Sequence, residues 1–153
     1  TKVSFYSEVF VTTDAKINKK LIGSKFNDDF TFGGGKDVMF GNSGNDKLNG
    51  AGGNDYLNGG VGNDILNGGN GKNTLIGGKG KDIFQLSKGK GFDLIKDFKD
   101  KEDKITYGSY PTKYLKLKNK GKDAYIYYAG DNDLLAKVKG AAGKLSSQGT
   151  YLV

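Results

Sequence analysis

A period of nine residues dominates the middle of the sequence and constrains the fold more than any other feature. Seven copies follow one another without a gap from residue 23 to residue 85. Glycine occupies the first position of six copies and the fourth position of six copies. The sixth position carries an acidic or amide side chain, and the eighth position is always apolar. Such a period is typical of repeat architectures, in which each unit packs only on its neighbours.

Each nine-residue unit has room for a turn and a very short strand. Six of its positions are too rich in Gly, Asn and Asp for regular structure, whereas three residues around the eighth position suit a strand. A single strand of this length is unstable, so the units must stack and bury the eighth-position side chains as a continuous column. That column consists of Phe30, Met39, Leu48, Leu57, Leu66, Leu75 and Phe84.

The pattern therefore predicts an all-β fold, a parallel β-roll solenoid in which two units make one coil. Odd-numbered copies are expected in one sheet and even-numbered copies in the other. We expect residues 1–22 to form an N-terminal strand-like cap, with a strand at about residues 3–13, and residues 23–85 to form the roll. Residues 86–153 are expected to form an antiparallel β-rich cap.

The sixth-position oxygens require a partner. They belong to Asp28, Asp37, Asp46, Asp55, Asp64, Asn73 and Asp82. Stacked turns bring these carboxylates close together, and like charges oppose folding unless a cation lies between them. Because carboxylate and carbonyl oxygens select a hard cation, we expect Ca²⁺ rather than Zn²⁺ or copper. Pairing the turns along each edge of the roll allows at most about five ions. The alternative is that the aspartates cap turns through Asx hydrogen bonds without a metal.

Composition excludes several functions. The chain has no cysteine and no histidine, which removes thiolate and imidazole metal sites and the catalysis that depends on them. The carboxylates are already assigned to the turns, so we do not expect an enzyme. The net charge of +7 comes from lysine alone, and no nucleic-acid-binding motif accompanies it. Apolar runs are too short to span a membrane, and we expect a monomer.

The repeats resemble the calcium-binding nonapeptide repeats of the repeats-in-toxin (RTX) family, G-G-x-G-x-D-x-U-x with U apolar. The family commonly continues with D-x-I-x-D-F-x-x-G-x-D-x-I, and the matching residues here are Asp93, Ile95, Asp97, Phe98, Asp103 and Ile105. Lys101 replaces the glycine of that motif. The resemblance adds Asp97 and Asp103 to the candidate metal ligands, whereas Asn73 and Phe26 depart from the pattern and are expected to weaken their turns.

The resemblance also implies a biological setting. Members of this family fold when they bind Ca²⁺ outside the cell, after export in an unfolded state by a type I secretion system. The chain would then be the C-terminal region of a larger secreted or cell-surface protein. Its uncleaved secretion signal is expected near the C-terminus, where residues 150–153 resemble the short apolar end of such proteins.

A lysine- and tyrosine-rich hairpin in the tail suggests a second function. Alternation over residues 114–128 places Leu115, Leu117 and Ile126 on a buried face. The opposite face would carry Tyr114, Lys116, Lys118, Tyr125 and Tyr127. Tyrosine rings stack on sugars and lysines neutralise carboxylates, so this face is a candidate site for an acidic polysaccharide. The repeat modules of alginate epimerases are similar in size and architecture. The alternative is a solvated edge with lysines that protect it from aggregation.

Overall fold

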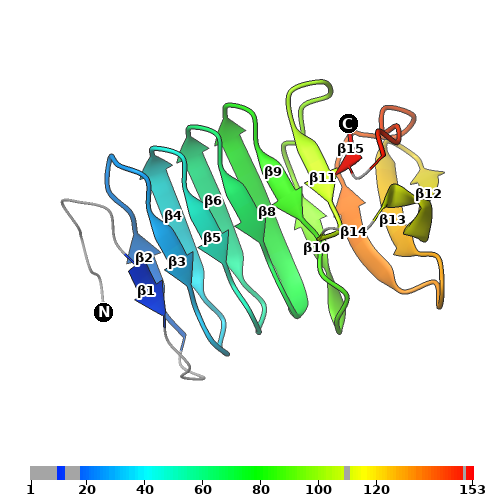
Figure 1. Ribbon diagram of the computed structural model, residues 1–153. Coiled ribbons are helices and arrows are strands. Elements are labelled where there is room, and N and C mark those ends of the chain that lie inside the picture. The colour runs from blue at the N-terminus through cyan, green and yellow to red at the C-terminus, as the bar shows by residue number, and fades with distance from the viewer. Residues whose placement is uncertain (1–9, 13–17, 109–110, 150) are drawn as a thin grey trace.

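Two parallel sheets face each other along a stacked-coil solenoid (Figure 1). The structure is a computed structural model, and it describes residues 10–12, 18–108, 111–149 and 151–153. The first sheet contains, in spatial order, β1 (Phe10–Thr12), β3 (Asp29–Thr31), β5 (Lys47–Asn49), β7 (Ile65–Asn67), β9 (Ile83–Gln85), β11 (Lys104–Thr106) and β15 (Tyr151–Leu152).

The second sheet runs beside the first and extends into the C-terminal region. It contains, in spatial order, β12 (Leu115–Lys120), β13 (Asp123–Tyr128), β14 (Leu134–Val138), β10 (Gly91–Ile95), β8 (Gly71–Lys79), β6 (Tyr56–Val61), β4 (Val38–Ser43) and β2 (Lys20–Ile22). Odd-numbered repeats therefore lie in one sheet and even-numbered repeats in the other, as predicted.

Successive strands within a sheet are offset by two repeats. Leu48 pairs with Leu66 in one sheet, and Met39 pairs with Leu57 in the other. This register stacks equal positions of the repeat on one another, so all seven eighth-position side chains are at most 1 % exposed. Burial of each large apolar side chain stabilises the fold by about 1.5–3 kcal/mol. The column between the two sheets is thus the core of the roll.

The stacking continues beyond residues 23–85 at both ends. Leu21 on β2 pairs with Met39 and is buried, although no repeat was predicted there. After the seventh repeat, β10 pairs parallel to β8 and β11 pairs parallel to β9. Ile95 and Ile105 on these strands extend the two apolar columns. Each sheet therefore gains a further parallel strand after the repeats.

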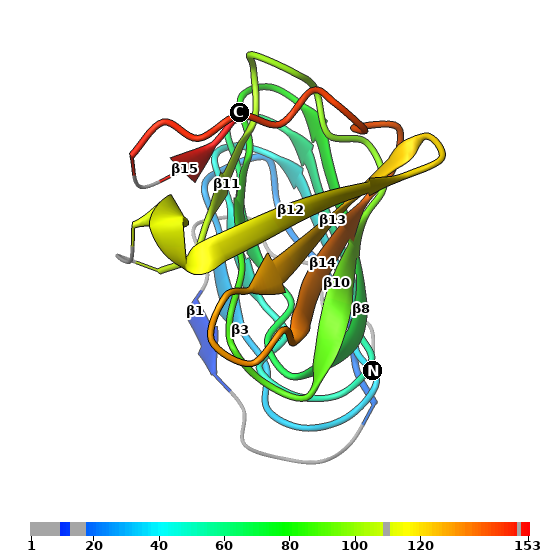
Figure 2. The same ribbon diagram turned by 90° about the vertical axis from the view of Figure 1, so that its right-hand side faces the viewer.

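The C-terminal region covers the end of the roll. Strands β12, β13 and β14 are antiparallel neighbours, and β14 then pairs parallel to β10 (Figure 2). The last strand, β15, pairs antiparallel to β11. The antiparallel C-terminal cap was predicted, whereas the parallel junction between β10 and β14 was not.

The N-terminal strand is described only over Phe10–Thr12, where β1 pairs parallel to β3. The remainder of the strand expected at residues 3–13 lies outside the described residues. Within the part of the chain that the structure covers, the helical content is a single 3-10 turn over Thr112–Tyr114. No helix in these residues has the length and apolar character needed to cross a bilayer.

Candidate metal centre

The sixth-position side chains lie at the two edges of the roll, in the turns that precede the strands. All seven are buried, with exposures of 3 % or less. The odd-numbered repeats place Asp28, Asp46, Asp64 and Asp82 along one edge. The even-numbered repeats place Asp37, Asp55 and Asn73 along the other. The structure therefore brings the predicted aspartates together in two separate columns.

One carboxylate oxygen of each internal aspartate ties its coil to the preceding coil. The backbone N–H of Asp28 donates to Asp46 Oδ1, and the N–H of Asp46 donates to Asp64 Oδ1, both at 2.8 Å. On the other edge, the N–H of Asp37 donates to Asp55 Oδ1 at 2.8 Å. These bonds link residues 18 positions apart and hold the carboxylates at fixed places in the stack.

The second oxygen of several carboxylates has no hydrogen-bond donor. Among the described residues, this applies to the buried Oδ2 atoms of Asp37, Asp46, Asp55, Asp64 and Asp82. A buried charged oxygen without a partner costs several kcal/mol. Such a group takes up a proton or binds a cation.

Backbone oxygens converge beside these carboxylates because the first repeat position is glycine. A β-carbon on Gly41 would overlap with Asp46 Oδ2 and would lie 2.5 Å from the carbonyl oxygen of Gly59. A β-carbon on Gly50 would likewise overlap with Asp55 Oδ2. The first-position glycines thus leave space in which carboxylate and carbonyl oxygens of successive coils meet. An all-oxygen donor set of this kind fits Ca²⁺.

No cluster of three or more acidic side chains able to hold a metal occurs in the described part of the chain. An ion between two coils would accordingly be held by at most two carboxylates, and backbone carbonyl oxygens would complete its coordination.

Burial raises the pKa of these carboxyls well above their ordinary value of 3.8. The pKa is about 7 for Asp46 and Asp55 and about 6 for Asp64 and Asp82. Burial is the largest cause in each case, and hydrogen bonds from backbone N–H groups oppose it. Neighbouring carboxylates of the same edge raise the pKa of Asp46 further. Without a cation, the folded chain therefore holds protons that the unfolded chain releases.

The raised pKa values predict an unusual pH dependence for the metal-free protein. Between about pH 4 and pH 7 the folded state binds more protons than the unfolded state, so stability falls as pH rises through this range. We expect the folded fraction of metal-free protein, followed by far-UV circular dichroism, to be higher at pH 5 than at pH 7.5. The measurement uses buffers stripped of divalent ions by a chelating resin. An equal or higher folded fraction at pH 7.5 would contradict the assignment of these carboxyls.

In the first turn of the odd-numbered edge, a serine donates the hydrogen bonds that the carboxylate accepts. Ser24 donates its backbone N–H to Asp28 Oδ2 at 2.7 Å and its hydroxyl to the same oxygen at 3.1 Å. Asp28 consequently lacks the unpaired oxygen that the internal aspartates carry.

In the last turn of this edge, protein groups also donate hydrogen bonds to the carboxylates. Asp103 accepts hydrogen bonds from the N–H groups of Asp82 and Lys99. Asp97 accepts from the N–H groups of Gly77 and Gly78, at 2.9 and 2.8 Å. The Lys99 ammonium donates to the carbonyl oxygen of Gly78 at 2.6 Å. A positive charge fixed to the chain thus lies on the final turn, where Asp97 and Asp103 were predicted as metal ligands.

The even-numbered edge ends in an amide–carboxyl pair that includes a residue not predicted as a ligand. Asn73 Nδ2 donates to Asp93 Oδ1 at 2.9 Å, and Asp93 is 3 % exposed. Burial raises the pKa of Asp93 to about 7. Asp93 lies 20 residues after Asn73, so the break in the period hid its position in the column. Asp93 and Ile95 are alternate residues of β10 and both are buried, and this two-residue spacing is the feature of the sequence that could have located Asp93.

Comparison with known proteins agrees with this geometry. The sequence profile of the RTX calcium-binding nonapeptide repeat, in four copies, matches residues 32–66, 49–84 and 58–95. Residues 32–95 carry RTX calcium-binding repeats. The matched RTX residues include all five aspartates with an unpaired Oδ2.

No curated protein matches the chain. Among solved structures, the solution structure of the AlgE6R3 subunit from the Azotobacter vinelandii mannuronan C5-epimerase is 22 % identical in sequence. The alignment covers 84 % of this chain and 74 % of that chain, with a TM-score of 0.32.

Beyond the RTX repeats, the hairpin places four of its five candidate residues on one face. Lys116 lies opposite Tyr127, and Lys118 lies opposite Tyr125, in the register of β12 and β13. The Lys118 ammonium is 5.1 Å from the centre of the Tyr127 ring, and the Lys137 ammonium is 5.3 Å from that of Tyr125. Sequence patterning missed Lys137, because it lies on β14 and reaches this face only through sheet pairing.

Two parts of the hairpin prediction need correction. Tyr114 lies in the 3-10 turn before β12 and lines a cavity together with Tyr128, on the face of β13 opposite to Tyr125 and Tyr127. Leu117 was expected to be buried but is 39 % exposed. The reason is that β12 is the edge strand of its sheet, whereas Ile126 on the neighbouring β13 is fully buried.

Proposed function

We propose that the chain is a non-catalytic folding module whose β-roll is completed by Ca²⁺. The observation that carries the proposal is the set of five buried aspartate oxygens without a donor, found among the described residues. In the absence of a cation these charges oppose stacking of the coils. At an ion concentration 100 times the dissociation constant, each bound ion stabilises the fold by about 2.7 kcal/mol. Three such ions contribute about 8 kcal/mol, which is comparable to the stability of a whole domain.

Three pairs of stacked turns have an unpaired oxygen on both sides, and we assign the tight sites to them. They are Asp37 with Asp55, Asp46 with Asp64, and Asp64 with Asp82. Two further pairs, Asp28 with Asp46 and Asp55 with Asn73, have an unpaired oxygen on one side only. We assign weaker sites to those pairs, which together gives the expected total of about five ions.

Isothermal titration calorimetry at pH 7.5, together with native mass spectrometry, tests this assignment. We expect three tightly bound Ca²⁺ ions, and up to two more that bind only at higher concentration. Mg²⁺ serves as the control, because it demands a stricter octahedral geometry and retains its water. Fewer than three tight ions, or equal binding of Mg²⁺, would contradict the assignment.

We also propose that this switch operates outside the cell. Extracellular calcium modules have dissociation constants of about 10⁻⁴–10⁻³ M, so sites of this class would be empty where Ca²⁺ is scarce. The chain would pass through a type I secretion system unfolded, with its signal near the C-terminus, and fold on exposure to Ca²⁺. The proposal includes residues 1–22 and 86–153 as caps of the roll in a larger secreted or surface protein.

A second candidate function is binding of an acidic polysaccharide to the hairpin. The specific observation is the face that carries Lys116, Lys118 and Lys137 beside Tyr125 and Tyr127. Bound Ca²⁺ would add to the net charge of +7 and strengthen attraction of a polyanion. Binding of this kind is expected to weaken steeply with salt.

A further inference from the structure

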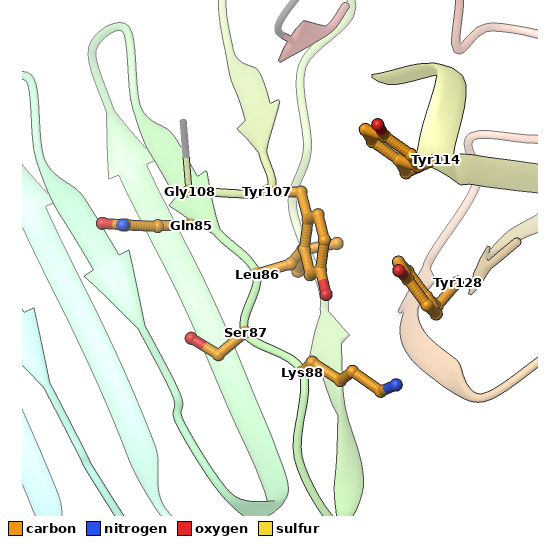
Figure 3. Close-up of a pocket in the computed structure, with 8 residues that line it drawn as sticks. All are labelled: Gln85, Leu86, Ser87, Lys88, Tyr107, Gly108, Tyr114 and Tyr128. Carbon is orange, nitrogen blue, oxygen red and sulfur yellow. The ribbon is translucent and has the colours of Figure 1, made fainter. Parts of the chain in front are cut away.

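A cavity of about 580 Å³ lies at the junction between the last coil of the roll and the C-terminal hairpin (Figure 3). Leu86 and Tyr107 form the wall on the side of the roll, and Tyr114 and Tyr128 form the opposite wall. Its volume is typical of small-molecule sites. The cavity shares no residue with the aspartate turns, and its only residue among the hairpin candidates is Tyr114.

The walls of the cavity are held by regular structure. Tyr107 is 7 % exposed, and its ring centre lies 5.8 Å from that of Tyr128. The N–H of Ala129 donates to the carbonyl oxygen of Tyr114 at 2.7 Å, which fixes Tyr114 against the end of β13. The three rings are therefore positioned by β-pairing and by packing at the end of the core. Preformed walls reduce the entropic cost of binding a ligand.

A lysine–aspartate ion pair lies at the edge of the cavity. The Lys88 ammonium lies 2.6 Å from the Asp131 carboxylate and 4.5 Å from the centre of the Tyr128 ring. Its hydrogen bond to Asp131 is the main cause that raises the pKa of Lys88, so the group is charged at neutral pH. An ammonium has three N–H donors, and Asp131 accepts one. Lys88 is thus oriented toward the ring while it retains donors for a second acceptor.

The chemistry of the cavity selects a class of ligand. The negatively polarised faces of aromatic rings attract the C–H groups of a saturated sugar ring, and phenol hydroxyls exchange hydrogen bonds with sugar hydroxyls. Asp131 offsets the charge of Lys88, and the remaining N–H groups of its ammonium can donate charge-assisted hydrogen bonds to a ligand carboxylate. We propose that this cavity binds one pyranose ring that carries a carboxylate, as a unit of an acidic oligosaccharide. The inference rests on the polysaccharide function proposed above and adds a second contact site for the same polymer, on the other face of β13 from Tyr125 and Tyr127.

Binding is measured by calorimetry and by tyrosine fluorescence, which is unobscured because the chain has no tryptophan. The probes are digalacturonate, a galacturonate hexamer and neutral cellobiose, all in the same Ca²⁺ concentration. Tyr114→Ala and Lys88→Gln test the cavity, and both side chains are exposed, so both variants should fold. Lys47→Gln, at an exposed lysine on β5 that belongs neither to the cavity nor to the hairpin face, is the matched control. Circular dichroism confirms that each variant is folded.

We expect digalacturonate to bind the wild-type protein and cellobiose to bind at least tenfold more weakly. Each cavity variant should weaken digalacturonate binding at least tenfold, and Lys47→Gln should change it less than twofold. If the hexamer binds in a salt-dependent manner and the cavity variants bind it like the wild type, the polysaccharide function stands and the cavity assignment is wrong. If neither uronate binds, both proposals fail.

Discussion

Gly53→Ala is expected to lower the thermal midpoint of the Ca²⁺-saturated protein by about 10 °C or more, which corresponds to roughly 3 kcal/mol in a domain of this size. Gly53 has a φ of 128°, which residues with a side chain rarely adopt. A β-carbon at this position would also overlap with the carbonyl oxygen of Gly35 in the preceding coil. Because that neighbour is backbone, the clash can be relieved only by separating the two coils.

Gly121→Ala is the matched control for this experiment. Gly121 has a positive φ of 63° in the hairpin turn, but a β-carbon there would have no atom within 4 Å. The substitution therefore costs only backbone strain of about 1 kcal/mol, which lowers the thermal midpoint by about 2–4 °C. Thermal unfolding followed by circular dichroism compares the two variants. If Gly53→Ala is no less stable than Gly121→Ala, the close stacking of coils described above is wrong.

Asp64→Asn is expected to raise the Ca²⁺ concentration at the midpoint of folding at least tenfold. Asp64 belongs to two of the three tight turn pairs, with Asp46 and with Asp82, so one substitution removes a charge from both sites. The same variant should stabilise the metal-free protein, because an amide can donate where a carboxylate cannot. Asn73 already does this in the next repeat, on the other edge of the roll, where its Nδ2 donates to the carbonyl oxygen of Gly69 at 3.4 Å.

Asp29→Asn provides the control for charge alone. Asp29, like Asp64, belongs to the repeats, but it lies on strand β3 and not in a turn. Its ion pair with Lys47 is 4.0 Å long and solvent-exposed. Such a pair contributes at most about 1 kcal/mol. We expect the Ca²⁺ midpoint of this variant to stay within twofold of the wild type. An equal shift in both variants would mean that net charge, and not the site, controls the response.

The division of the repeats between two sheets was predictable because every unit has the same length. A constant turn and strand place Leu48 on Leu66 and Met39 on Leu57 without any knowledge of distant contacts. The same periodicity located the aspartate columns. It did not reveal that Oδ1 is taken by a backbone N–H while Oδ2 is left without a donor, since that depends on how closely the coils approach.

The coil before the first repeat was missed because its sixth position is Lys19. The structure explains why a lysine is tolerated there. The hydrogen bond to each aspartate Oδ1 comes from a backbone N–H of the preceding coil, which any residue except proline can supply. The backbone N–H of Lys19 donates to Asp37 Oδ1 at 2.8 Å. Leu21 keeps the apolar eighth position, and Asn18 matches the asparagine that four of the seven repeats carry at their fifth position, so these two residues could have revealed the coil.

The contacts that close the ends of the roll could not be predicted from the period. The pairing of Asp93 with Ala136 joins segments of unrelated sequence and is set by packing at the end of the core. Ser24 and Lys99 satisfy the terminal turns through hydrogen bonds that no repeat position specifies. Each of these contacts occurs where the repeating pattern stops.

Far-UV circular dichroism during a Ca²⁺ titration of metal-free protein at pH 7.5 tests the calcium-dependent fold most directly. Mg²⁺ at equal ionic strength is the control. Because the buried aspartates repel one another without a cation, we predict a largely unfolded spectrum at the start and a cooperative change to β-structure in Ca²⁺ alone. A metal-free protein that is already fully folded and does not respond to Ca²⁺ would contradict the proposal, and the aspartates would then be turn caps.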